Sequence, residues 1–292
     1  MKCSIFHISL FFTLFLIYFL LFKTFIFQKI EQKSRFGILQ NWLDCAQKSF
    51  NFNEKPQDFW NSTTKKIDFC GKVFETLEIR GFNNTDEQKF AILPKNRLNP
   101  IDSPDVLLSL GIGKDIKAEK KLKLAYGPNP IQFYGADPMF MDNYEIYREI
   151  GSYFPLAISS TDGFFDAGVL VGKVYRNLRV YHINFLHFIK NILNLKIIDH
   201  LWMDNEYSEY GLFPYFYKNG ILDQEGITVC QLNMEVHNAT LAQKSEFKGF
   251  VRRIIDDQKY AIVNNYFEGI HYRLFLVNLD SDYCLYKFFY QL

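Results

Sequence analysis

The stretch LLSLGIGKDIKAEKKL, from Leu107 to Leu122, decides the fold class of this chain. Strand-forming residues end at Gly111-Ile112-Gly113, and a charged, helix-favouring segment follows. Glycine lets a backbone turn sharply and lets a ligand approach the main chain. A strand, a glycine turn and a helix in this order hold a nucleotide-like cofactor in many α/β proteins, although a tight turn without a ligand has the same pattern.

The segments after Asp105 alternate between strands and helices. This alternation predicts a mostly parallel sheet with helices on both faces. The predicted strands are residues 106–110, 131–135, 154–159, 178–183, 197–203, 227–236, 260–264 and 271–278. The predicted helices are residues 115–124, 143–152, 185–193, 208–218 and 241–257.

Composition and charge bound the class of protein. The chain has 292 residues, of which 48% are hydrophobic, and this suits one large domain with its own core. The formal net charge is +1, with acidic and basic residues well mixed. A nucleic-acid-binding protein would show a basic patch or stripe, so we expect no nucleic-acid partner.

The N-terminus carries an apolar run, IFHISLFFTLFLIYFLLF, at residues 5–22. A run of about 18 such residues is long enough to span a bilayer as a helix. No small-residue cleavage site follows it, so we predict an uncleaved signal anchor and a single-pass membrane protein. We divide the chain into a tail and anchor (1–27), a stem with an irregular region (28–103) and the main domain (104–292).

The orientation of this anchor is contested by two signals. Lys and Arg are more frequent just after the run than before it, which favours a cytoplasmic main domain. Three glycosylation sequons, at Asn61, Asn83 and Asn238, favour the opposite side. We expect a lumenal (Golgi or endoplasmic reticulum) or extracellular domain and a glycoprotein.

The cysteines add to this expectation. Cys45 and Cys70 flank a polar segment and would pair in an oxidising lumen. Cys230 lies in an apolar strand, where we expect a buried thiol, and Cys284 has no obvious partner.

Polar residues follow the predicted strands at the edge where α/β sheets bind ligands. Asp137 follows the second strand, at a spacing from the glycines that suits the hydroxyl groups of a ribose, although a lone Asp there also suits a helix N-cap. A nucleoside-containing cofactor is therefore the favoured interpretation of the glycine turn.

Two later strands end in acids. The first of these strands is followed by Asp204, Glu206 and Glu209. These acids would orient an amino group of a cofactor, act as a base or hold a divalent cation. The alternative is structural, because acids also suit the first turn of a helix. Glu235 and His237 end the next strand on one face and form an acid/base pair or a structural contact. We assign no residue to a metal site.

The order of these signals resembles the FkbM-type S-adenosylmethionine-dependent methyltransferases, and in particular a membrane-anchored, nematode-like branch. The matching segments are LSLGIG, FYGADP, PLAISSTDG, DHLWMDNEYSEY and TVCQLNMEVH, within residues 104–278. The resemblance implies a Rossmann-like sheet of seven strands in which the last strand is reversed. It also implies transfer of a methyl group from S-adenosylmethionine, and in many relatives the acceptor atom is an oxygen.

The resemblance also implies roles for single residues. Gly111 and Gly113 would border the amino-acid part of the cofactor, and Asp137 would bind its ribose. Ser159 and Asp162 would lie near the adenine. The acidic set of the family aligns with Asp204, Glu206 and Glu209. The candidate catalytic residues are Asp204, Glu206 and His237, because a base helps to remove the proton of a hydroxyl acceptor. We expect a small-molecule or glycan acceptor.

Two alternatives come from other function classes. A type II membrane glycosyltransferase has the same topology, and Asp280-Ser281-Asp282 would hold a metal and a sugar nucleotide, although this tripeptide follows the last predicted strand and suits a surface loop. A catalytically inactive binding protein with the methyltransferase fold is favoured by three departures from the family: Ser109 for an acid, Trp202 for a frequent lysine, and Tyr207 for a glycine.

Overall fold

A computed structural model of the chain describes residues 37–96, 104–172, 174–237, 240–268 and 271–289. The chain forms two compact units, residues 1–41 and 42–292, and the second contains all of the elements below. This second unit includes helix α2 and strands β1 and β2, which come from the region predicted as a stem. The predicted anchor lies outside the described residues, within which no helix is long and apolar enough to cross a bilayer.

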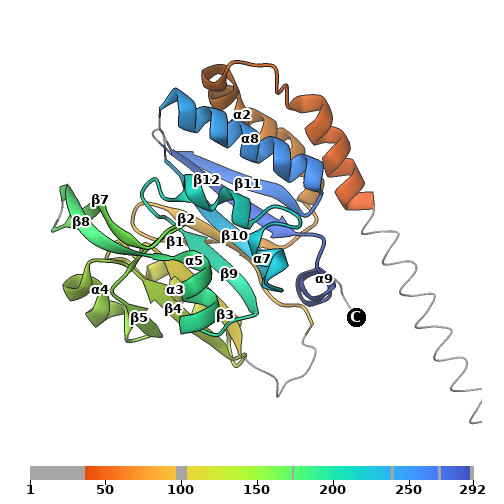
Figure 1. Cartoon of the computed structure of the whole chain (residues 1–292). Helices are drawn as coiled ribbons and strands as arrows, with labels where there is room; N and C mark the ends of the chain where they lie inside the picture. Colours follow the sequence, from red (N-terminus) through yellow and green to blue (C-terminus); the bar gives the residue numbers. More distant parts are fainter. Residues whose placement is uncertain (1–36, 97–103, 173, 238–239, 269–270, 290–292) are drawn as a thin grey trace, which may run out of the picture. The chain divides into compact units, whose positions relative to one another are not determined.

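Seven strands of the described residues form the central sheet, in the order β11-β12-β10-β9-β3-β4-β5 (Figure 1). Strand β12 runs antiparallel to both of its neighbours, whereas β10, β9, β3, β4 and β5 are parallel. This confirms the predicted Rossmann-like, mostly parallel sheet with its last strand reversed. The strands are β3 (Asp105–Leu110), β4 (Ile131–Ala136), β5 (Ser152–Phe154), β9 (Ile197–Met203), β10 (Thr228–Val236), β11 (Tyr260–Glu268) and β12 (His271–Asn278).

The chain reverses direction across the sheet at β3, which lies between β4 and β9. In open α/β sheets the carboxyl ends of strands beside such a switch point form a crevice, because the connections leave in opposite directions. The helices are α2 (Pro56–Gly71), η1 (Lys72–Phe74), α3 (Lys117–Tyr126), α4 (Phe140–Tyr147), α5 (Phe185–His187), η2 (Phe188–Ile192), α6 (Glu209–Leu212), η3 (Phe213–Tyr215), α7 (Ile221–Gln224), α8 (Leu241–Asp257) and α9 (Asp282–Phe288).

Both faces of the sheet are covered, as the alternation along β12 shows. The ring of Tyr272 packs on Trp60 of α2 and Phe247 of α8, and these two helices lie side by side (Figure 1). The next residue, Arg273, forms an ion pair with Glu235 on the other face, because neighbouring strand residues point to opposite sides. That other face is covered by α3 and by the hairpin of β1 (Ile79–Asn83) and β2 (Gln88–Ile92).

Two buried amides bind the β1–β2 hairpin to the central sheet. The side chain of Asn233 accepts from the backbone N–H of Phe90 and donates to its carbonyl, both at 2.8 Å. Gln231 makes the same pair of hydrogen bonds to Ile92, at 2.8 and 2.9 Å. Each amide satisfies the backbone groups of β2 as a neighbouring strand would, which explains why two polar side chains are buried in β10.

A smaller sheet of three strands, in the order β6-β8-β7, lies beyond β5 in the chain. Its strands are β6 (Ala157–Ser159), β7 (Gly163–Val171) and β8 (Val174–Asn184). The prediction of one strand over residues 154–159 was wrong, because Pro155 separates β5 from β6 and the two strands join different sheets. Strand β7 was missed, and only the second half of β8 was predicted.

Two predicted helices were too long. The helix predicted over residues 143–152 is α4, which ends at Tyr147, and Ser152 already belongs to β5. The helix predicted over residues 208–218 is two short turns, α6 and η3. Pro214 lies in the first turn of η3, and its ring prevents a continuous α-helix from α6.

Two disulfides join the four cysteines of the described residues. The bond between Cys45 and Cys70 confirms the predicted pair. The second bond joins Cys230 of β10 to Cys284 of α9, so the expectations of a buried thiol and of an unpartnered Cys284 were wrong. Helix α9 had not been predicted, and it brings Cys284 to the sheet.

Ser109, at the position in β3 where the resemblance predicts an acid, forms a buried hydrogen bond. The hydroxyl of Ser109 donates to Glu119 of α3 at 2.9 Å, and both side chains are almost fully buried. Burial raises the pKa of Glu119 to about 7. The carboxyl group is therefore neutral in acid and becomes an uncompensated buried charge in alkali.

We predict that Glu119→Gln makes the protein more stable at alkaline pH. A carboxyl group with a raised pKa contributes its full stability below its ordinary pKa of 4.5, and the contribution is lost as the pH rises through about 7. The loss for Glu119 is about 3 kcal/mol at pH 8 or above. Urea unfolding at pH 5 and pH 8.5 measures it: the variant should lose less stability than the wild type between these values. The same change at exposed Glu149 is the control, and equal pH dependence in wild type and Glu119→Gln would contradict the prediction.

Candidate functional site

The glycine loop after β3 makes a close contact with the end of β9. Gly111 has a φ of +76°, and a Cβ atom at this position would lie 1.9 Å from the carbonyl oxygen of Asp204. The backbone N–H of Asp204 donates to Leu110, and that of Gly111 donates to Ala136 of β4. Only glycine permits this approach, which places the loop directly beside the acids that follow β9.

Gly113 differs from Gly111 in what surrounds it. Its φ is +59°, and a Cβ atom there would meet no atom within 4 Å. Both glycines line a cavity, but a side chain has open space only at Gly113, because the space beside Gly111 is filled by the end of β9.

The carboxylate of Asp137 holds this loop in place. One oxygen accepts from the backbone N–H groups of Ile112 (2.9 Å) and Gly113 (3.3 Å), and the other accepts from Met139 (2.8 Å). Burial raises the pKa of Asp137, and these hydrogen bonds oppose the effect. Asp137 lines the same cavity as both glycines, so the loop and the acid share one hollow, with most acceptor positions of the carboxylate already occupied.

Two adjoining cavities open at the carboxyl ends of β3, β4, β9 and β10. The first is lined by the glycine loop, Asp137 and an apolar wall of Leu156, Ala157 and Ile158. The second has a volume of about 420 Å³ and is polar. The two cavities adjoin, and they share these lining residues: Gly111, Gly113, Gly168, Leu170, Tyr175, Asp204 and Glu206. Gly168, Leu170 and Tyr175 come from the β7–β8 hairpin, which forms a wall that the sequence prediction did not contain.

Asp204, Glu206 and His237 converge in the second cavity, as predicted from their places after β9 and β10. The Nε2 atom of His237 lies 3.5 Å from Oδ1 of Asp204 and 3.4 Å from Oε2 of Glu206. The other ring nitrogen, Nδ1, lies 3.1 Å from Oε1 of Glu209, which also accepts the backbone N–H of His237 at 2.8 Å. Glu209 is fully buried, so His237 is held in one orientation.

The electrostatics of this cluster follow from burial and from carboxylates that lie close together. Burial opposes a charge on His237, but the hydrogen bond to Glu209 and the charges of Asp204 and Glu206 outweigh it and raise its pKa to about 9. Burial and the repulsion of Glu235 raise the pKa of Asp204 to about 7. Burial and the repulsion of Asp204 raise the pKa of Glu206 to about 7. Perturbed groups that gather in a cavity mark a functional site.

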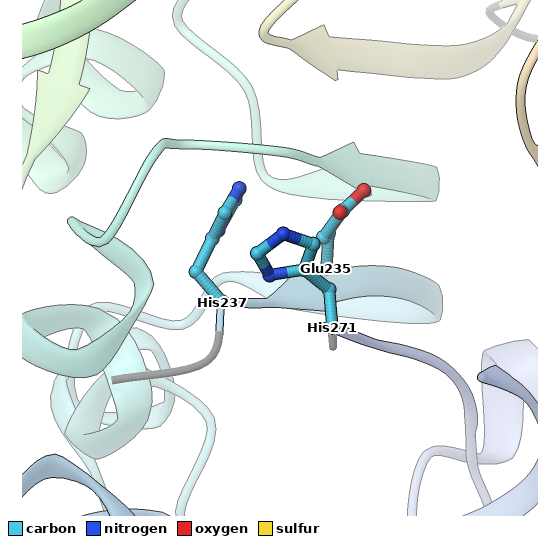
Figure 2. Close-up of side chains that lie close together, drawn as sticks. All are labelled: Glu235, His237 and His271. Carbon is cyan, nitrogen blue, oxygen red and sulfur yellow. The ribbon is translucent and has the colours of Figure 1, made fainter. Parts of the chain in front are cut away.

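Glu235 and His271 extend the cluster beyond His237. Figure 2 shows the three side chains gathered where β10 ends and β12 begins. Glu235 forms an ion pair with Arg273 at 2.9 Å, and the rings of His237 and His271 lie with their centroids 4.7 Å apart. Burial, the neighbouring His237 and Arg273 lower the pKa of His271 to about 4, so this imidazole is neutral at physiological pH.

Tyr207 occupies a strained position beside this cluster. Its φ is +74°, and Glu206 before it has a φ of +46°. Bulky residues rarely adopt such values, which cost about 1–3 kcal/mol and persist where the surrounding structure enforces them. The ring is half-exposed and its centroid lies 5.0 Å from that of His237. The backbone at Tyr207 therefore has a conformation that glycine adopts freely, with a tyrosine in it.

The remaining predicted residues lie apart from the cavity linings. The hydroxyl of Ser159 bonds to the backbone of Thr161, and the carboxylate of Asp162 accepts the backbone N–H of Asn184. Their assignment to the adenine stays a prediction. Asp280 pairs with Lys218 at 3.0 Å, and Asp282 begins α9, so this tripeptide has no connection with the two cavities.

Sequence reasoning missed His271 and Arg273 as members of the site. Both lie in β12, the reversed strand, whose start lies beside the end of β10: Tyr272 between them is paired with Val236. These two residues could have been found from the prediction that the last strand runs antiparallel. In such a strand the first residues, rather than the last, lie at the ligand-binding edge of the sheet.

Comparisons with known proteins identify the family. The profile of the methyltransferase FkbM domain matches residues 44–262, which is well over half of the chain. The uncharacterized protein C28H8.7 of Caenorhabditis elegans is 24% identical over 258 residues, which is 88% of this chain and 82% of that protein.

Two solved structures show weaker likeness. The methyltransferase FkbM of Methylobacillus flagellatus is 9% identical with a TM-score of 0.40, and the match covers 81% of this chain but only 58% of the bacterial chain. The ribosomal protein L11 methylase of Lactobacillus delbrueckii subsp. bulgaricus is 9% identical with a TM-score of 0.29, over 74% of this chain and 79% of that chain. The extent of the domain match carries the assignment: this chain belongs to the methyltransferase FkbM domain family.

Proposed function

We propose that this protein transfers a methyl group from S-adenosylmethionine to an oxygen of a small-molecule or glycan acceptor. The observation that carries the proposal is that the glycine loop of a methyltransferase-family fold lies beside an acidic cluster. Gly111, Gly113, Asp204 and Glu206 line both of the adjoining cavities, and His237 lines the second.

The lining of the first cavity supports a cofactor site there. Gly113 exposes backbone beside open space, and Leu156, Ala157 and Ile158 offer an apolar surface for a planar base. When bound, the cofactor supplies an electrophilic methyl group on a sulfonium sulfur. Asp137 supports this use of the cavity by fixing the loop through backbone hydrogen bonds, and its contact with a ribose remains part of the proposal.

The second cavity supports the transfer to an acceptor. Its carboxylates offer hydrogen-bond acceptors to a hydroxyl group, and Asp204 and Glu206 line both cavities. Little covalent chemistry is asked of the protein in methyl transfer, since holding the two reacting atoms in line supplies much of the acceleration. Glu206 would take the proton of the acceptor hydroxyl, and His237 would hold the two carboxylates in position.

We also propose that the second unit matures in an oxidising compartment, on the lumenal or extracellular side of a membrane reached through the N-terminal apolar run. Two disulfides support this, because thiols of cytosolic proteins are kept reduced. The sequon residues Asn61 and Asn83 are exposed, whereas Asn238 lies outside the described residues. Protease protection together with a glycosidase-dependent mobility shift tests the topology.

We predict that the wild-type protein binds S-adenosylmethionine and S-adenosylhomocysteine with one site per chain, measured by isothermal titration calorimetry. The variant Gly113→Asn should weaken both affinities at least tenfold, which corresponds to about 1.4 kcal/mol, because its side chain enters the open space of the first cavity. Asparagine tolerates a positive φ better than most residues, so the fold should persist.

The matched control is Gly226→Asn. Gly226 has a φ of +63°, a Cβ atom added there would meet no atom within 4 Å, and the residue lines neither cavity. Its melting temperature should match that of Gly113→Asn, while its cofactor affinity stays at the wild-type value. No heat and no thermal shift for the wild type at millimolar cofactor would instead support the inactive binding protein.

We predict that Glu206→Gln lowers the rate of methyl transfer by about 10²–10⁴-fold, because the amide cannot accept a proton from the acceptor. The measurement is incorporation of a radiolabelled methyl group into a panel of hydroxyl acceptors. The affinity for S-adenosylhomocysteine should change little. A parallel loss of cofactor affinity would reassign Glu206 to cofactor binding.

We predict that the double variant Cys230→Ala, Cys284→Ala is less stable by about 4 kcal/mol, from the 54-residue separation that the disulfide closes. Denaturant unfolding measures the difference. Peptide mapping without reduction should recover Cys230 joined to Cys284 and Cys45 joined to Cys70 in protein secreted from eukaryotic cells. Recovery of free thiols at all four positions would overturn the proposed compartment.

A further inference from the structure

The buried nitrogen of His237 has the surroundings of a metal ligand. His237 is 5% exposed, and its Nε2 atom faces two carboxylate oxygens at 3.4 and 3.5 Å. Both distances exceed the 2.7–3.2 Å of ordinary N–H···O hydrogen bonds. The Oδ1 atom of Asp204 is itself fully buried and makes no hydrogen bond within the described residues. Three ligand-type atoms therefore converge without bonding one another.

The spacing of these atoms suits a small cation. Bonds from zinc to nitrogen or oxygen are about 2.1 Å long, so two ligand atoms 3.4–3.5 Å apart subtend an angle of about 110° at the metal. This is the angle of tetrahedral coordination, which Zn²⁺ prefers. The ligand atoms of Asp204, Glu206 and His237 all lie within 4.8 Å of one another, as three ligands of one ion require.

The contact behind His237 is the one that metal-binding histidines make. Its Nδ1 faces Oε1 of the fully buried Glu209, and a second hydrogen bond from the His237 backbone reaches the same oxygen. A carboxylate that accepts the N–H of one ring nitrogen leaves the other nitrogen with its lone pair directed at the metal. Glu209 is thus a positioning residue, which orients His237 toward Asp204 and Glu206.

The ion pairs around the cluster neutralise some of its carboxylates and not others. Glu235 and Glu87 are paired with the cations of Arg273 and Lys89. Among the described residues, the ion-pair contacts of Asp204 and Glu206 are all to His237.

His271 lies beside His237, with 4.7 Å between the ring centroids. The ligand atoms of Glu235, His237 and His271 also fall within 4.8 Å of one another, so a further imidazole stands next to the site (Figure 2). Imidazole combined with carboxylate favours zinc and related transition metals over Mg²⁺ and Ca²⁺, which prefer oxygen alone.

We propose that Asp204, Glu206 and His237 bind one divalent transition-metal ion of the Zn²⁺ type, with its fourth coordination position open to the polar cavity. Three protein ligands and one open position are the arrangement of reactive zinc sites, in which the ion binds and acidifies an oxygen. The site itself does not depend on methyl transfer. A role of the ion in binding the hydroxyl oxygen of the acceptor rests on the proposed function, and the Oε1 atom of Glu206, which is not the oxygen that faces His237, would then take the acceptor proton.

The test titrates Zn²⁺ into the chelator-treated full chain, without S-adenosylmethionine, in competition with a chromophoric chelator. We expect one tight site per chain. His237→Gln and Asp204→Asn should weaken Zn²⁺ binding at least 100-fold. Glu209→Gln should weaken it about 10–100-fold, because it acts only through the orientation of His237. The control is His187→Gln, which removes an exposed histidine and should leave the affinity unchanged.

Two further measurements keep the result interpretable. Near-ultraviolet circular dichroism of each variant shows whether the fold persists, and Co²⁺ in place of Zn²⁺ should give the intense visible bands of a tetrahedral site that disappear in His237→Gln. Absence of a tight Zn²⁺ site in the wild type, or an unchanged affinity in a folded His237→Gln, would overturn the proposal, leaving a protonated His237 that pairs with the two carboxylates. Failure of the proposed methyl transfer would show instead as loss of cofactor binding in the separate calorimetry, with Zn²⁺ binding intact.

Discussion

The contact between Gly111 and the carbonyl of Asp204 is the constraint on which the rest of the site depends. The ends of β3 and β9 meet here, and the space between them is too small for any side chain. Because Asp204 leads directly to Glu206 and Glu209, the contact also sets where the acids begin. The glycine loop and the acidic turn therefore contact each other directly, and the position of one fixes the position of the other.

The acids near this contact fall into two groups, which differ in the cations that they pair with. Glu87 and Glu235 face Lys89 and Arg273 across the β1–β2 side of the sheet, and their ion pairs anchor the hairpin that covers this face. Asp204, Glu206 and Glu209 surround one histidine. Burial and neighbouring carboxylates raise the pKa of Asp204 and of Glu206, because a negative charge is costly in a space that water enters poorly. In this second group one imidazole faces three carboxylates.

Departures from the family pattern change the chemistry around the loop more than its shape. Ser109 stands where the resemblance predicts an acid, and it contacts a carboxyl group that α3 provides through Glu119. Tyr207 stands where the resemblance predicts a glycine, and it adopts a left-handed backbone at a cost in strain. The ring of Tyr207 lies beside His237 and lines the polar cavity.

The sequence alone determined the central sheet and the polar residues at its ligand-binding edge. The boundaries of β9, α8 and β12 match their predicted residues, because long apolar runs and clear turn residues define them locally. Asp204, Glu206 and His237 were predicted as one site for the same reason: residues that follow parallel strands meet at one edge. Local signals of this kind need no knowledge of which strands are neighbours.

Only the tertiary structure decided the contacts between distant segments. The order of the sheet brings His271 to His237, α9 brings Cys284 to Cys230, and α3 brings Glu119 to Ser109. The β7–β8 hairpin was largely missed because its strands are exposed and lack a buried alternating face. Such partners depend on packing between segments far apart in the chain, and no pattern within either segment specifies the other.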